Sequence, residues 1–176
     1  MKKLCLLHTT DQYVEMMSEP FTKPFIKENP DIEYFDIADS SLIAETKKAG
    51  YATPAVARRM YCYMMAAVDA GADAILVTCT SVNTVTKKIR DMIPIPVIGI
   101  EEPVAKIAVE KGTKIGILSS VATSAVPVQN TIRECAASIG KQITTEIAVA
   151  DGAFEALLNG NRPLHDEKVK KALESL

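Results

Sequence analysis

Residues 74–85 constrain the fold of this chain more than any other segment. Residues 74–78 form a near-continuous apolar and partly β-branched run, typical of a parallel strand buried on both faces. The run then changes to small polar residues that can cap a helix. A buried strand leading directly into a helix predicts an α/β protein.

Cys79 lies at this change from strand to helix. In open α/β sheets, a residue at the carboxyl end of a parallel strand faces the crevice where ligands bind. The free N–H groups and the positive dipole end of the helix favour a thiolate or a bound carboxylate there, and Thr80 and Ser81 add two hydroxyl donors. The alternative is that Cys79 is a small buried side chain, since free cysteine is among the most buried residue types.

Strand and helix patterns alternate along the rest of the chain. Because a helical segment separates most successive strands, we expect mostly parallel sheets joined by right-handed crossovers. Residues 11–27 are harder to interpret: Pro20 and Pro24 predict a short helix and then a loop that covers the site. The predicted strands are 3–8, 31–37, 74–78, 97–100, 114–118 and 143–149, and the predicted helices are 42–49, 54–70, 82–92, 103–111, 127–139, 151–158 and 166–176.

Other polar residues follow the predicted strands. The loop after the first strand, which begins at Thr9, is expected at the same sheet edge as Cys79. His8 is a candidate acid, base or substrate donor, although a single histidine at a strand end is more commonly structural. Residues 119–124 form a second hydroxyl-rich turn between strand and helix. Glu101 and Glu102 suggest either paired acid and base chemistry or, as we favour, acids that complement a helix dipole.

Composition excludes several classes of protein. The 176 residues are 48% hydrophobic, which is enough for a core. A net charge of -2 without tryptophan argues against nucleic-acid binding. No apolar run is long enough for a membrane span and the start is too polar for a signal peptide, so we expect a cytoplasmic protein.

Motifs for metal, disulfide and nucleotide sites are also missing. No glycine-rich phosphate loop follows a strand, which disfavours a flavodoxin-like nucleotide-binding domain. The cysteines are irregularly spaced and there are only two histidines, so neither a metal site nor a disulfide framework is expected. The four cysteines are Cys5, Cys62, Cys79 and Cys135.

Two segments resemble the aspartate/glutamate (and hydantoin) racemase superfamily. Residues 73–84 are similar to its first catalytic segment, in which a cysteine ends a strand and small polar residues follow. Residues 116–123 are similar to the opening strand and turn of its second lobe. The resemblance implies two pseudo-symmetric α/β lobes with mostly parallel sheets, residues 1–100 and 101–176, and an active site in the cleft between them. The second lobe is expected to be incomplete, with the family's second cysteine beyond residue 176.

This resemblance implies a cofactor-independent racemase or isomerase that acts on a small carboxylate or amino acid, without pyridoxal phosphate or metal. Cys79 would be the acid/base of the first lobe. Deprotonation beside a carboxylate needs donors that neutralise the enolate oxygens, for which Thr80, Ser81 and Thr123 are candidates. Thr9 and Thr10 match the family's first substrate loop, and Ser119 is a further substrate-binding candidate. A homodimer is compatible with this resemblance.

Thr80 is also compatible with reactions other than racemisation. Racemases usually carry asparagine at this position, and Cys-Thr-Ser is closer to maleate isomerase-like relatives, in which the cysteine attacks an alkene carbon. Arylmalonate decarboxylase-like relatives use a single cysteine as proton donor. A non-catalytic small-acid binding protein is the alternative from another class. Fold analogy does not choose among these functions.

Overall fold

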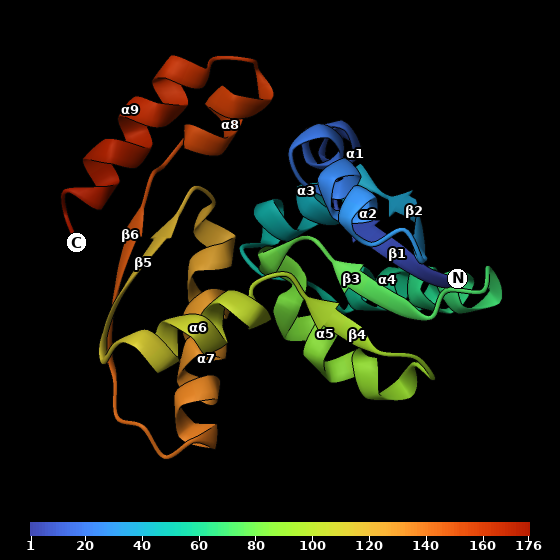
Figure 1. Ribbon diagram of the computed structural model, residues 1–176. Helices are drawn as coiled ribbons and strands as arrows, with labels where there is room; N and C mark the ends of the chain where they lie inside the picture. Colours follow the sequence, from blue (N-terminus) through green and yellow to red (C-terminus); the bar gives the residue numbers. More distant parts are fainter. The chain divides into compact units, whose positions relative to one another are not determined.

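The computed structural model describes residues 1–176 as two compact units, Met1–Ile100 and Glu101–Leu176 (Figure 1). Each unit has a parallel sheet, flanking helices and a hydrophobic core of its own. The predicted α/β class with parallel sheets is therefore confirmed. None of the helices combines the length and the apolar character that crossing a lipid bilayer requires.

The first unit contains a four-stranded sheet in the order β2-β1-β3-β4. Its strands are β1 (Lys2–His8), β2 (Ile32–Ala38), β3 (Ala74–Val77) and β4 (Val97–Gly99). All three pairings are parallel, and Leu7 of β1 lies between Ile37 and Val77. Because the strands run the same way, the residues after β1, β2 and β3 meet at one edge of the sheet.

One face of this sheet carries the main core. It is covered by α3 (Ser40–Ala49), α4 (Pro54–Asp69) and α5 (Asn83–Ile89). Helix α4 turns an apolar stripe toward this core, with Met60 and Met64 fully inaccessible. Each such side chain contributes about 1.5–3 kcal/mol by leaving water. This packing holds β1 and β3 rigidly beside each other.

The segment over the opposite face differs from its prediction. It consists of α1 (Gln12–Met17), the π-helix η1 (Ser18–Thr22) and α2 (Lys23–Glu28), so the expected loop is wrong. Pro24 stands at the start of α2, where no N–H donor is needed. The wider π turn, closed by the Lys23 N–H and the Ser18 carbonyl, accommodates Pro20. The segment and the sheet enclose an apolar pocket of about 440 Å³.

The second unit is built on β5 (Lys114–Ser119) and β6 (Thr144–Val149), which pair in parallel. On one face, α6 (Glu102–Lys111) and α7 (Ala122–Ser138) pack on Ile117. On the other, Gly116 lies against Leu176, whose Cδ1 would be 3.2 Å from an added Cβ. Figure 1 shows α9 (Arg162–Leu173) on that side, and α8 (Ala153–Leu158) beyond the end of β6.

Three predicted helices differ from those in the structure. Proline favours the first helical position, which predicted a start at Pro127, but α7 begins at Ala122 and contains that proline. The last helix begins at Arg162 rather than at 166, because the Asn161 side chain caps it by accepting from the Leu164 N–H at 3.2 Å. The helix expected over 82–92 is broken into η2 (Thr80–Val82), α5 and η3 (Arg90–Met92).

Candidate active site

Cys79 lies just beyond β3, at the carboxyl edge of the sheet. Its backbone is extended (φ -131°, ψ 117°), and the chain turns into η2 at the next residue. The residue is 9% exposed. The local sequence accounts for this geometry, since the β-branched strand ends in small polar residues that favour a turn.

Four groups that can donate a hydrogen bond lower the pKa of the Cys79 thiol. They are the side chains of Thr9 and Ser81 and the backbone N–H groups of Ser81 and Val82. The Thr9 hydroxyl is fully buried and has no hydrogen-bond partner in the resting structure, and it is one of the groups that lower the pKa of the Cys79 thiol. The structure thus brings Thr9 and Ser81 to Cys79, whereas Thr80 starts η2 and is half-buried.

The protonation state of Cys79 differs from the prediction. Burial raises the pKa of the thiol, and the hydrogen bonds from Thr9, Ser81 and Val82 lower it by less. The expected resting thiolate is therefore wrong, because burial outweighs the donors. Cys79 rests as a neutral thiol whose anion has four hydrogen-bond donors ready to receive it.

Tyr13 is a neighbour of Cys79 that the sequence did not identify. Burial raises its pKa to about 12, with a smaller contribution from the charge of Cys79. Tyr13 belongs to α1, and its backbone N–H donates to the Thr10 carbonyl at 3.3 Å. The only signal in the sequence is its place shortly after the loop at residues 9–11.

Thr10 lies in a polar cluster at the same edge. The Ser40 hydroxyl donates to Asp11 Oδ1 at 2.5 Å and lies 3.3 Å from Thr10 Oγ1. The pKa of Asp11 is lowered chiefly by the Ser40 hydrogen bond and then by the Gln12 N–H. Asp11 is therefore ionised at neutral pH. The sequence did not indicate this contact, because Ser40 and Asp11 are 29 residues apart along the chain.

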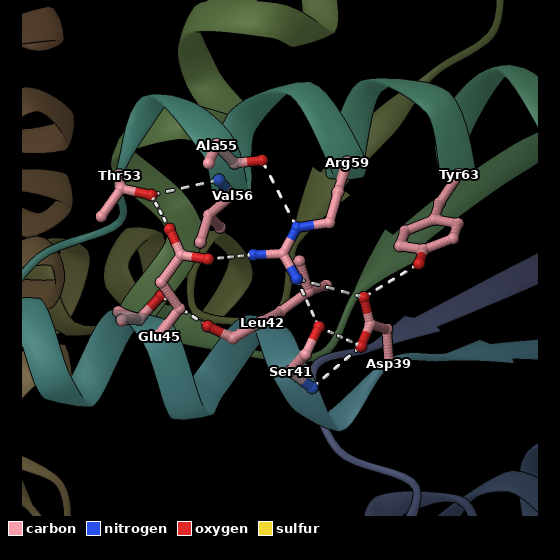
Figure 2. A network of polar contacts seen from close by, with 10 residues as sticks. Asp39, Ser41, Leu42, Glu45, Thr53, Ala55, Val56, Arg59 and Tyr63 are labelled. Atoms are coloured by element: carbon pink, nitrogen blue, oxygen red, sulfur yellow. Dashed lines mark hydrogen bonds and ion pairs between the residues drawn. The ribbon is translucent and has the colours of Figure 1, made fainter.

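A larger polar network joins α3 to α4, starting at the residue that follows β2 (Figure 2). Asp39 caps α3 by accepting from the Ser41 N–H at 2.8 Å, and it also accepts from the Tyr63 hydroxyl at 2.9 Å. Arg59 bonds to Ser41 and Glu45 and lies 3.7 Å from the Asp39 carboxylate. These contacts hold the start of α3 firmly beside the edge of the sheet.

The two candidates in the second unit lie in a turn with its own hydrogen bonds. Ser119 ends β5 and its hydroxyl donates to the Val121 carbonyl at 2.9 Å. Ser119 Oγ also contacts Ser124 Oγ. Thr123 lies in the first turn of α7 and is half-buried. A role for Ser119 and Thr123 in binding substrate stays a prediction.

The family model for the Asp/Glu/Hydantoin racemases matches residues 5–176. The chain belongs to this family. The match covers β1 through α9, including the Cys79 turn and the turn at residues 119–124. The resemblance to these racemases is therefore confirmed.

Solved glutamate racemases share the fold of this racemase-family chain. The RacE1 isoform from Bacillus anthracis is 18% identical with a TM-score of 0.68, and the match covers 99% of this chain and 63% of that one. The enzyme from Francisella tularensis, solved with D-glutamate, is 12% identical with a TM-score of 0.65 and coverages of 98% and 74%. The Aquifex pyrophilus enzyme is 19% identical with a TM-score of 0.58 and coverages of 82% and 54%.

These identities show a shared fold alone, and the chain spans only 54–74% of the length of the three enzymes. No curated protein sequence gives a significant match.

None of the other cysteines of this racemase-family chain follows the end of a strand. Cys5 is buried within β1, Cys62 is exposed on α4 and Cys135 is half-buried on α7. All four are free thiols. No group of three His, Cys, Asp or Glu side chains is arranged as metal ligands.

Proposed function

We propose that this protein is a cofactor-independent racemase or isomerase of a small carboxylate or amino acid, with Cys79 as its acid/base. Membership of the racemase family supports the reaction class. The observation that carries the proposal is a buried thiol at the carboxyl edge of the sheet, whose pKa is lowered by four nearby donor groups. A merely structural cysteine has no need of donors that stabilise its anion.

Because Cys79 rests as a neutral thiol, the first step it performs is to donate a proton. A neutral thiol gives its proton to a carbanion, and the reverse reaction needs the thiolate as base. After donation, the hydrogen bonds from Thr9, Ser81 and Val82 stabilise the sulfur anion. The same buried site strengthens the interaction of a developing enolate with nearby donors, for which Thr10, Thr80 and Ser81 are candidates. Ser119 and Thr123 are the candidates of the second unit.

Solvent deuterium exchange at the α-carbon tests this function. Aspartate, glutamate, hydantoins and unsaturated diacids are incubated in D2O with the wild-type chain and with Cys79→Ser. The wild type is expected to label one class of substrate, and Cys79→Ser to be slower by about 100-fold to 10,000-fold, because a hydroxyl is a far weaker acid. The melting temperatures should stay similar, since serine keeps the size of the side chain.

Cys62→Ser is the matched control, because it makes the same change on the exposed surface of α4. It should retain wild-type exchange. Equal labelling by wild type and Cys79→Ser would contradict the proposed role. Ligand-induced thermal stabilisation without any labelling would indicate a small-acid binding protein instead.

A second candidate is an arylmalonate decarboxylase-like reaction. Such a reaction requires a single thiol, and Cys79 supplies one at the carboxyl edge of the sheet. A single thiol can protonate only one face of a carbanion. Decarboxylation of a disubstituted malonate in D2O would then give one labelled enantiomer, whereas racemisation gives both.

A further inference from the structure

His8 ends β1, the strand that lies between β2 and β3. It is fully buried, and its ring contacts both neighbouring strands. Nε2 lies 2.9 Å from Oδ1 of Asp36 in β2, and Nδ1 lies 2.8 Å from Oγ1 of Thr78, which follows β3. The imidazole therefore spans three strands at the edge where Cys79 lies.

His8 and its partner Thr78 each stand one residue before a residue of the candidate site. His8 precedes Thr9, and Thr78 precedes Cys79. The backbone ladder reaches as far as the Thr78 N–H, which donates to the Leu7 carbonyl at 3.0 Å. Beyond this bond, side chains determine the spacing between the segments that follow β1 and β3. The bond between His8 and Thr78 is the next contact that holds these two segments together. It therefore limits the distance between the Thr9 hydroxyl and the Cys79 sulfur.

Hydrogen-bond chemistry assigns a direction to each contact. The Asp36 carboxylate only accepts, so Nε2 of His8 carries a proton. With the proton on Nε2, Nδ1 is the acceptor for the Thr78 hydroxyl at 2.8 Å, a shorter contact than the 3.3 Å from the same hydroxyl to the Leu7 carbonyl oxygen. Each ring nitrogen has one partner and no capacity left for a substrate, which argues against His8 as the acid or base.

We propose that His8 is a positioning residue: its bond to Thr78 places the Thr9 hydroxyl against Cys79 and so stabilises the thiolate that the reaction forms. The inference deepens the proposed function and depends on it only where activity is concerned. Its geometric part can be tested on the thiol itself, whether or not the substrate is known.

Two substitutions separate the two contacts of the ring. The amide of Asn reaches the position of Nδ1, whereas the amide of Gln reaches the position of Nε2. His8→Asn therefore keeps the partner of Thr78 and loses that of Asp36, which is 25% exposed and can bind water. His8→Gln keeps Asp36 and loses Thr78. Thr78→Val removes the same bond from the other side, together with the 3.3 Å contact from the Thr78 hydroxyl to the Leu7 carbonyl, and Thr78→Ser retains both.

The readout is the ionisation of Cys79, followed by NMR of cysteine labelled at 13Cβ as the pH is raised. His8→Gln and Thr78→Val should shift the midpoint of Cys79 upward by about one pH unit, which is the size expected for losing one hydrogen bond to a charged group. His8→Asn and Thr78→Ser should leave it near the wild-type value. Exposed Cys62 is the internal reference, and its transition should coincide in the wild type and all four variants.

Two outcomes would overturn the inference. One is an unchanged Cys79 midpoint in both His8→Gln and Thr78→Val. The other is an equal shift in His8→Asn and His8→Gln, which would indicate general disruption of the strand end. In the exchange assay, His8→Gln should lower kcat with little change in KM. If the wild type shows no exchange while the variants show the NMR shifts, the proposed function is contradicted and the positioning role stands.

Discussion

Two buried cysteines show how the surroundings determine thiol chemistry. Cys5 lies within β1, where burial and then the charge of Asp36 raise its pKa to about 12. The pKa of Cys79 is also raised by burial, but four hydrogen bonds act in the opposite direction. The sequence could predict that Cys79 ends a strand, because strand and turn are local patterns. It could not predict a neutral thiol, because burial depends on residues such as Tyr13 that approach from other elements.

Cys5 provides a test of this electrostatic picture. Its folded pKa of about 12 lies above the ordinary value of 9.0, so the folded state keeps a proton that the unfolded state loses. Wild-type stability should therefore fall as pH rises above about 9, and by about 1.4 kcal/mol for each pH unit from this group. Cys5→Ala lacks the thiol, so its deficit relative to wild type should shrink between pH 8 and pH 10.

Urea denaturation at the two pH values measures this difference. Cys62→Ala, on the exposed surface of α4, should keep a constant offset from wild type. A constant offset for Cys5→Ala as well would show that the thiol ionises equally in the folded and unfolded states.

At the level of helices and strands, local capping explains what was predictable. Helix α3 starts at an Asp39 cap and stops at Gly50, whose φ of +79° suits glycine, and both signals are local. The π-helical link between α1 and α2 was not predictable, since its hydrogen-bond register depends on packing against the sheet. The same holds for the site: Thr9, Cys79 and Ser81 follow local strand ends, whereas Ser40 reaches Thr10 only through the tertiary fold.

The network in Figure 2 makes Asp39 the test of capping. Burial alone would raise its pKa, but hydrogen bonds from Ser41 and Tyr63 and the charge of Arg59 outweigh it, so the folded pKa is lowered. The stabilisation is therefore present at neutral pH and is lost as the pH falls below about 4, through the folded pKa. Asp39→Ala should cost about 2 kcal/mol at pH 7, combining a lost cap with lost partners for Tyr63 and Arg59.

Asp39→Asn is the matched variant, because its amide oxygen can still accept from the Ser41 N–H. It should lose less stability than Asp39→Ala at pH 7 and show a weaker dependence on acid pH than wild type. Both quantities come from chemical denaturation at pH 7 and pH 3.5. Equal losses in the two variants would assign the whole effect to the charge rather than to the cap.

Across the whole molecule, apolar side chains separate into two cores. The larger core joins β1 and β3 to α3, α4 and α5, and the smaller joins β5 to α6 and α7. The two cores have no residue in common. A side chain removed from one core leaves a cavity whose cost falls first on the elements that line it.

Hydrogen exchange can therefore show whether the two cores open independently. Met64→Ala empties a fully buried position in the larger core and should cost about 2–5 kcal/mol. Amides of β1 and β3 should then exchange faster, whereas those of β5 and β6 should keep wild-type protection, because local opening draws only on the contacts of its own unit. Ile132→Ala in the smaller core should give the reverse pattern. Equal acceleration of all four strands in either variant would mean that the two units unfold as one cooperative body, and the chemistry at Cys79 would then depend on the stability of the entire chain.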